Sequence, residues 1–304
     1  MEKLKNRTLL FLVLCFVVGC SGKEGLMRDF DDAGHTPQGE QDYKVAMNVG
    51  SYNIRLLTNA DQGDLAWANR KQWARKIVDD YDFDVLGTQE GYLSQIRDLV
   101  EEKDYDYVAV GRDDGKNQGE TCAILFKKEK FTLLANGTFW LSTTPNEPSY
   151  GWDANIRRIC TWVRLKEKEA DEEFFVFNVH YDHQGTVARG ESSRLMLNKI
   201  REIAGNGARV FMTGDLNAEP NAEPITVLLG DNILWDSRIL TQTPPTGPEG
   251  TSYGYNLNTL PTSRIDYVFV TRSISVLSYV TIDDDFTTGN IASDHLPVLI
   301  KAAW

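Results

Sequence analysis

The sequence predicts a layered α/β sandwich built from mixed β-sheets. Short runs of β-branched and aromatic residues are much more numerous along the 304 residues than stretches with helical spacing. A parallel barrel needs a helix after nearly every strand, so the scarcity of helical stretches favours sheets packed in layers. No internal repeat interrupts this pattern, and the length does not require a second folded domain.

Residues 1–20 are predicted to be a lipoprotein signal peptide. Three basic residues within the first seven precede the apolar run Leu9–Gly19, which is too short for a comfortable membrane span. The small residue directly before Cys20 resembles a bacterial lipobox, in which the cysteine is acylated. We therefore expect a lipidated Cys20 and a location at the bacterial cell envelope, on the outer membrane or the periplasmic face. An ordinary secretory signal is the alternative.

Residues 21–43 are expected to be a flexible tether, because they are polar and carry few apolar anchors. Residues 44–304 are expected to form the folded domain, as a monomer. The net charge of −12 would become about −14 on removal of the signal, which takes away three bases and one acid. This acidic balance disfavours nonspecific binding to nucleic acid, where basic patches supply most of the affinity.

Within the domain, the expected strands are short runs rich in β-branched and aromatic residues, and most are bounded by polar or Gly-containing segments. In chain order they are Val45–Ile54, Val85–Thr88, Tyr105–Val110, Cys122–Phe126, Phe131–Trp140, Arg158–Leu165, Phe174–His180, Arg209–Thr213, Ile265–Val270, Val276–Ile282 and Leu296–Ile300.

Helical spacing of apolar residues appears at Trp67–Asp80, Leu93–Glu101 and Val187–Ala204. The Pro- and Gly-rich stretch Thr241–Gly254 is expected to be a long loop. Cys122 and Cys160 both fall in apolar strand-like runs, which favours two buried thiols, and a disulfide between neighbouring strands is the alternative.

Residues able to perform chemistry gather at the ends of these strands. Asp215 and Asn217 follow an apolar strand and a glycine, and their spacing allows both side chains to point into one cleft. Asp294 and His295 stand together at the mouth of the last strand. Asp266 begins another strand, where a buried carboxylate could orient an imidazole.

The histidines and two further fragments also lie at the ends of predicted strands. Of four histidines in the chain, His180 and His183 lie at the end of one strand and His295 at the start of another. Asn53 ends the first strand of the domain, and Glu90 emerges at the tip of the second. A carboxylate beside an imidazole can bind a metal through one group and a phosphate through the other.

Together these fragments resemble the endonuclease/exonuclease/phosphatase superfamily, whose fold is that of deoxyribonuclease I. The resemblance spans residues 45–303 and is closest to a bacterial lipoprotein branch. It implies a four-layered α/β sandwich with two central mixed β-sheets flanked by helices. The fragments that carry it are Asn53, Gln89-Glu90, Asn178-Val-His180, Gly214-Asp-Leu-Asn217, Arg264-Ile-Asp266 and Ser293-Asp-His295. The features of the bacterial branch lie at Gly111–Gly115, Gly137–Ser142 and Tyr150–Asp153.

The resemblance also implies a metal site. Glu90 would be the main ligand of Mg²⁺, or of Mn²⁺, assisted by Asn53 and Asp294. Mg²⁺ prefers oxygen ligands and keeps several waters, which suits a set of carboxylates and an amide.

The resemblance further implies the roles of the remaining residues. Asp215 would align or deprotonate the attacking water, and Asn217 would hold that water or the phosphate. His295, oriented by Asp266, would contact a phosphate oxygen or exchange a proton. His180 would act from the other side, and Glu120 resembles the carboxylate that pairs with that histidine.

Two nearby residues have open interpretations. Arg112 could clamp a phosphate with both guanidinium nitrogens, or it could form an ion pair in a solvated loop. His183 could touch the substrate, or it could orient its loop.

Three functions are compatible with these observations. The first is a metal-dependent phosphodiesterase or phosphomonoesterase that acts on a phosphate ester outside the cytoplasm, by in-line attack of water. The second is an extracellular nuclease that scavenges DNA or RNA, which lacks the support of a basic stripe with interleaved aromatic residues. The third is a noncatalytic binding module, which the intact set of Glu90, His180, Asp215 and His295 disfavours. A membrane is expected as a partner only through the lipid anchor.

Overall fold

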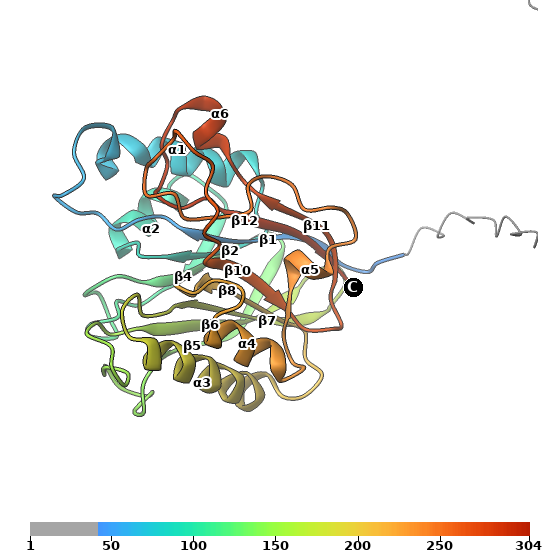
Figure 1. The fold of residues 1–304 in the computed structure, drawn as a ribbon. Coiled ribbons are helices and arrows are strands. Elements are labelled where there is room, and N and C mark those ends of the chain that lie inside the picture. Colours follow the sequence, from blue (N-terminus) through green and yellow to red (C-terminus); the bar gives the residue numbers. More distant parts are fainter. Residues whose placement is uncertain (1–41) are drawn as a thin grey trace, which may run out of the picture. The chain divides into compact units, whose positions relative to one another are not determined.

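Two packed β-sheets with helices on both outer faces make up residues 42–304, the part of the chain that the computed structural model describes (Figure 1). The predicted signal peptide with Cys20, and nearly all of the predicted tether, lie outside these described residues. Across residues 42–304, no helix combines the length and apolarity that a bilayer span requires.

The first sheet has six strands and one parallel pair. Strands β1 and β2 are parallel and are connected through helix α1 (Trp67–Asp80), whereas the other neighbours are antiparallel. In spatial order the sheet contains β11 (Ser275–Thr281), β12 (Val298–Ala303), β1 (Ala46–Asn53), β2 (Val85–Gln89), β4 (Cys122–Lys127) and β3 (Tyr105–Val108).

The second sheet repeats this plan. Its parallel pair is β7 and β8, connected through helix α3 (Thr186–Ala204), and its other neighbours are antiparallel. In spatial order it contains β5 (Phe131–Trp140), β6 (Ile159–Glu167), β7 (Glu173–His180), β8 (Val210–Asp215), β10 (Asp266–Val270) and β9 (Trp235–Asp236). The predicted mixed sheets are thus confirmed.

Helices cover the outer faces of both sheets and complete four layers (Figure 1). Helices α1 and α2 (Leu93–Val100) bury apolar side chains against the first sheet. Helices α3 and α4 (Glu223–Gly230) do the same against the second sheet. Three shorter helical segments lie in the connections: η1 (Gly63–Leu65), α5 (Ser237–Leu240) and α6 (Asp284–Thr288).

The layer between the sheets changes from apolar to polar along the strands. Because alternate residues of a strand share one face, each central strand sends every second side chain into this layer. At one end these side chains are apolar, including Met47, Val49, Val176 and Phe211. At the other end, where β1, β2, β7 and β8 finish, they are buried and polar: Ser51, Asn53, Gln89, Asn178, His180, Thr213 and Asp215.

The structure differs from the sequence prediction in a few elements. Strand β12 begins at Val298 rather than Leu296, because Pro297 has no backbone N–H to donate to a ladder. Helix α4 was not expected, since it spans only eight residues and its continuous apolar run shows little helical periodicity. Cys122 and Cys160 are both buried free thiols, which decides between the two alternatives for them.

Candidate active site

The polar end of the inter-sheet layer rests on a buried network of amides. Asn178 Oδ1 accepts hydrogen bonds from Gln89 Nε2 at 2.7 Å and from Thr213 Oγ1 at 3.0 Å. Asn178 Nδ2 donates to the carbonyl oxygens of Thr88 and Ala123. These bonds join β7 and β8 of one sheet to β2 and β4 of the other. The two halves of the site therefore have a fixed relative position.

Gly87 allows this close approach of the sheets. A Cβ atom at position 87 would lie 2.2 Å from Thr213 Oγ1 and 2.7 Å from Asn178 Oδ1. Contacts this short exclude a larger side chain unless the network moves. A glycine in the middle of β2 is therefore required by the packing of the polar layer.

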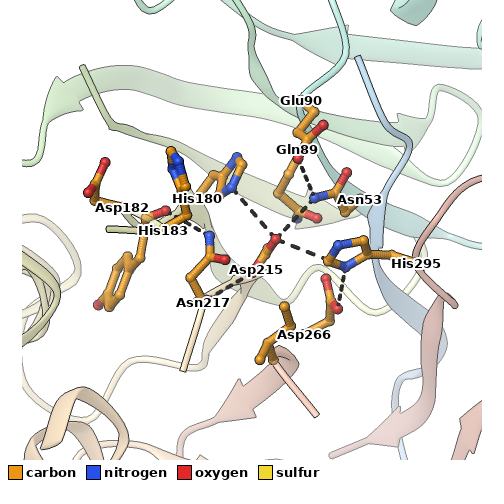
Figure 2. A network of polar contacts seen from close by, with 12 residues as sticks. Asn53, Gln89, Glu90, His180, Asp182, His183, Asp215, Asn217, Asp266 and His295 are labelled. Carbon is orange, nitrogen blue, oxygen red and sulfur yellow. Dashed lines mark hydrogen bonds and ion pairs between the residues drawn. The ribbon is translucent and has the colours of Figure 1, made fainter. Parts of the chain in front are cut away.

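Asp215 is the point at which the site converges (Figure 2). Its Oδ2 accepts a hydrogen bond from Asn53 Nδ2 at 3.0 Å, and it lies 3.6 Å from His180 Nε2 and 4.0 Å from His295 Nδ1. Its Oδ1 accepts from the backbone N–H of Asn217 at 2.8 Å. Burial, followed by the charge of Asp266, raises the pKa of Asp215 to about 7. A carboxylate with such a pKa can take a proton near neutral pH.

His295 is held by Asp266 on one side of Asp215. The His295 Nδ1 and Asp266 Oδ2 atoms are 2.8 Å apart, and Asp266 is the first residue of β10, fully buried. Burial alone would lower the pKa of His295, but the charge and hydrogen bond of Asp266 outweigh it and raise that pKa well above its ordinary value. His295 is therefore a cation at neutral pH.

His180 has a different environment on the other side. Its Nδ1 lies 4.0 Å from Glu120 Oε2, so neither ring nitrogen is within hydrogen-bonding distance of Glu120 or Asp215. Burial lowers the pKa of His180 well below its ordinary value, and the charges of Arg158 and Arg112 lower it further. His180 is therefore neutral at neutral pH.

Arg112 and Glu120 form a bidentate ion pair with each other. Arg112 Nη1 lies 2.6 Å from Glu120 Oε2, and Arg112 Nη2 lies 2.6 Å from Glu120 Oε1. Each side chain is only 12% exposed. Of the two interpretations of Arg112, the ion pair holds, although it is buried rather than solvated. The pairing of Glu120 with His180 that the resemblance implied is a secondary contact, because the carboxylate is already occupied by Arg112.

One predicted metal ligand, Glu90, belongs to a group of side chains that could hold a metal ion. Ligand atoms of Glu90, His180 and Asp215 are within 4.8 Å of one another. Burial raises the pKa of Asp294, the charge of His295 lowers it, and the charge of Glu90 raises it. The effect of Glu90 means that the Glu90 and Asp294 carboxylates repel each other. A divalent cation would relieve this repulsion, and the donors are the oxygens that Mg²⁺ and Mn²⁺ prefer. The residues therefore fit the expected metal.

Asn53 is oriented differently from a ligand. Its Nδ2 donates to Glu90 Oε1 and to Asp215 Oδ2, both at 3.0 Å, whereas its Oδ1 accepts from the backbone N–H of Arg55. In this orientation the amide bridges two carboxylates instead of offering its oxygen to a cation. The direct contribution of Asn53 to the metal site stays a prediction.

Asn217 and His183 complete the predicted set. Asn217 has a left-handed backbone with φ of 46°, and its Nδ2 donates to the carbonyl of Tyr181 at 3.0 Å. His183 is exposed, and its Nδ1 lies 2.9 Å from Arg158 Nη2. That contact supports a role of His183 in its own loop. Figure 2 shows His183 farther from Asp215 than His180 is.

Several residues of the site were not predicted. Gln89 and Asn178 are members of the predicted motifs without a role of their own, and no role is predicted for Ser51 and Thr213. The signal that could have found most of them is the period of two, because Ser51, Asn178 and Thr213 each precede a predicted site residue by two positions on the same strand.

Comparisons with known proteins agree with this arrangement. A family model described as the Endonuclease/Exonuclease/phosphatase family matches residues 50–295. The chain is similar to a mannosyl-6-phosphatase of Bacteroides thetaiotaomicron, with 36% identity, a TM-score of 0.80, and coverage of 85% of this chain and 100% of that chain.

Two further relatives extend the comparison. An endonuclease/exonuclease/phosphatase family protein of Bacteroides thetaiotaomicron has 35% identity and a TM-score of 0.81, with coverage of 86% of this chain and 97% of that chain. An uncharacterized protein of Acanthamoeba polyphaga mimivirus is 25% identical over 246 residues, which are 77% of this chain and 91% of the viral protein.

Proposed function

Because the chain belongs to the endonuclease/exonuclease/phosphatase family, we propose that it is a divalent-metal-dependent phosphoesterase that acts outside the cytoplasm. The observation that carries the proposal is the convergence of Asn53, His180 and His295 on Asp215 Oδ2. This set combines a buried base, a neutral imidazole and a cationic imidazole at the polar end of the inter-sheet layer. In-line attack of water on phosphorus needs groups of these kinds.

Each residue has a proposed part in that attack. Glu90 and Asp294 would hold the cation. Asn53 would fix the relative positions of the Glu90 and Asp215 carboxylates through its two hydrogen bonds. A bound divalent ion supplies Lewis-acid polarisation of the phosphoryl group and neutralises developing charge. Asp215 would accept the proton of the attacking water. His295 would donate a hydrogen bond to a phosphoryl oxygen, and His180, on the opposite side, would relay a proton to the leaving oxygen as its bond to phosphorus breaks.

We propose a sugar phosphate monoester of the mannose 6-phosphate class as the substrate. The 36% identity to the mannosyl-6-phosphatase, over the whole of that chain, supports this choice. The net charge of −12 supports a small or glycan-borne phosphate over a nucleic acid, since no excess of basic residues is available to follow a phosphate backbone.

The proposal is tested by assaying mannose 6-phosphate, a chromogenic monoester, a chromogenic diester and DNA with Mg²⁺ or Mn²⁺. We expect release of inorganic phosphate from mannose 6-phosphate and abolition of turnover by EDTA. Glu90→Ala should remove activity together with metal dependence while leaving the far-ultraviolet circular dichroism spectrum unchanged. Removal of one essential electrostatic group typically costs about 100- to 1,000-fold in kcat.

The matched control is Glu129→Ala, which removes an exposed carboxylate two residues before the start of β5, far from the polar edge. Its turnover should equal that of the wild-type protein. Preferential cleavage of DNA would replace the sugar phosphatase assignment with a nuclease. Full activity of Glu90→Ala, or no turnover of any phosphate ester, would contradict the proposed enzyme.

A further inference from the structure

Arg70 of α1 is a fully buried cation without an acidic partner in the described part of the chain. Its side chain is 0% exposed, and its hydrogen bonds go to backbone carbonyl oxygens. A buried charge is costly unless its donors are satisfied, and an apolar side chain of similar size would avoid that cost. The segments that the guanidinium holds in place therefore indicate the role of Arg70.

Four of the five acceptors lie on two segments that flank the proposed metal site. Nη1 donates to Ile54 O at 2.6 Å and to Ala292 O at 3.0 Å. Nη2 donates to Arg55 O at 2.7 Å and to Leu56 O at 3.4 Å, and Nε donates to Leu65 O at 3.0 Å. One guanidinium thus joins the turn after β1, residues 54–56, to the segment that leads into Asp294.

The turn after β1 is strained and contacts the metal site directly. Arg55 has a left-handed backbone with φ of 56°, which is unfavourable for a residue other than glycine. The next residue, Leu56, donates its backbone N–H to Glu90 Oε2 at 3.1 Å. Arg55 Nη1 lies 3.7 Å from Asp294 Oδ2. Displacement of this turn would therefore move the partners of both carboxylates.

The second segment is fixed to the first by another bond. Ser293 Oγ donates to the carbonyl of Asn53 at 2.6 Å, one residue before the turn. Ala292, the acceptor of Arg70, stands two residues before Asp294. A short series of hydrogen bonds through the Arg70 guanidinium therefore links the turn that contacts Glu90 to the segment that carries Asp294.

We propose that Arg70 is a positioning residue of the metal site, which holds the 54–56 turn and the 292–294 segment so that Glu90 and Asp294 can share one cation. The inference rests on the proposed function for the identity of that cation. Lysine cannot replace this arrangement, because an ammonium group has three donors on one atom, whereas the guanidinium spans separate carbonyls with a planar fork.

The test compares Arg70→Lys with Arg75→Lys in the full chain. Arg75 lies on the same helix, and its guanidinium also donates to carbonyl oxygens, those of Asp98 and Glu101 at the end of α2, away from the site. Mn²⁺ binding is measured by electron paramagnetic resonance of the free ion, without substrate. Loss of a residue that orients ligands costs about 10- to 100-fold in metal affinity. We expect a Kd for Mn²⁺ raised by that factor in Arg70→Lys and unchanged in Arg75→Lys.

Kinetics provides a second readout. The Mn²⁺ concentration that gives half-maximal turnover should rise in parallel with Kd in Arg70→Lys, and kcat should recover in part at saturating Mn²⁺. A merely structural role would lower the folded fraction and leave the Kd of the folded protein unchanged. A folded Arg70→Lys protein with the wild-type Kd would overturn the inference.

A further variant covers the case in which Arg70→Lys does not fold. Gln95 clamps the same turn from α2, with Nε2 donating to Arg55 O at 2.9 Å and Oε1 accepting from Leu57 N at 2.7 Å. Gln95→Ala should also raise the Kd for Mn²⁺, and an unchanged Kd would overturn the positioning role of the turn. If the wild-type protein itself neither binds Mn²⁺ nor turns over phosphate esters, the proposed function fails first, and the inference with it.

Discussion

His180 and His295 lie on opposite sides of Asp215, and their surroundings shift their pKa values in opposite directions. Both rings are buried, so desolvation alone would make both neutral. His295 has the Asp266 carboxylate 2.8 Å from its Nδ1, whereas His180 has the guanidinium charges of Arg158 and Arg112 nearby. The neighbouring charges, rather than burial, decide which imidazole carries a proton.

The difference assigns separate tasks to the two rings. A cationic His295 can donate a hydrogen bond to a phosphoryl oxygen and stabilise its negative charge. A neutral His180 can accept a proton, which a permanently charged ring cannot do. Pairs of titratable groups whose environments push their pKa values apart are typical of acid–base sites. The comparison therefore predicts distinct consequences for each ring and for each neighbouring carboxylate.

The largest effect is expected for His180→Ala. Loss of an acid–base group typically costs about 100- to 10,000-fold in turnover, so we expect kcat to fall at least ~100-fold. The matched control is His183→Ala, three residues further along the chain in the loop after β7, whose exposed ring contacts Arg158. A surface substitution of that kind changes free energies by about 0.5 kcal/mol, or roughly twofold in rate. Equal losses in the two variants would contradict the assignment to His180.

A smaller and pH-dependent effect is expected for Asp266→Asn. Asp266 raises the pKa of His295, so the cationic form persists as pH rises, and activity that depends on it is lost only above that raised pKa. Without the Asp266 charge, the lowering effect of burial on the pKa of His295 is less opposed, so fewer of the rings carry a proton at pH 7.5. A pKa change of one unit is a tenfold change in the ratio of the two forms, so we expect kcat to fall about 10-fold at pH 7.5.

The pH profile separates this explanation from a loss of orientation. Activity of Asp266→Asn should recover as pH falls from 7.5 toward 6, whereas the decline of the wild-type protein on the alkaline side should begin at higher pH. A uniform loss of activity at every pH would show that Asp266 acts through geometry alone. The measurement is kcat against pH at saturating metal.

The fold and the composition of the site were predictable from the sequence for the same reason. Strand periodicity and the glycine before Asp215 are local signals, and the C-terminal ends of parallel strands share one edge. Strand pairing therefore brings Asn53 close to Glu90 in one sheet and His180 beside Asp215 in the other, and the packing of the two sheets brings the two pairs together. The structure brings all four together at the polar end of the inter-sheet layer.

The partners of these residues could not be predicted, because they depend on the conformations of loops and on distances between segments remote in sequence. Arg112 reaches Glu120 only across the loop that returns to β4. The orientation of the Asn53 amide is set by two carboxylates from two different sheets. Arg70 looks like any basic residue of an amphipathic helix, and only the packing of α1 on the turn after β1 buries its guanidinium.

The smallest effect on turnover is expected for Glu120→Gln, the counterpart of Asp266→Asn on the His180 side. Its carboxylate is 4.0 Å from His180 Nδ1 but 2.6 Å from both nitrogens of Arg112, so its loss removes an ion pair rather than a partner of the imidazole. A change in kcat no larger than about fivefold is expected, which corresponds to the net free energy of one hydrogen bond.

The free energy of unfolding of Glu120→Gln should fall by up to about 3 kcal/mol, since Arg112 loses a buried counter-charge. Chemical denaturation and kcat, measured on the same preparation, separate these effects. If kcat instead fell as far as in His180→Ala while stability stayed unchanged, Glu120 would be the partner of His180. Each imidazole would then have its own carboxylate partner, and the two rings would differ only in the distance to that partner.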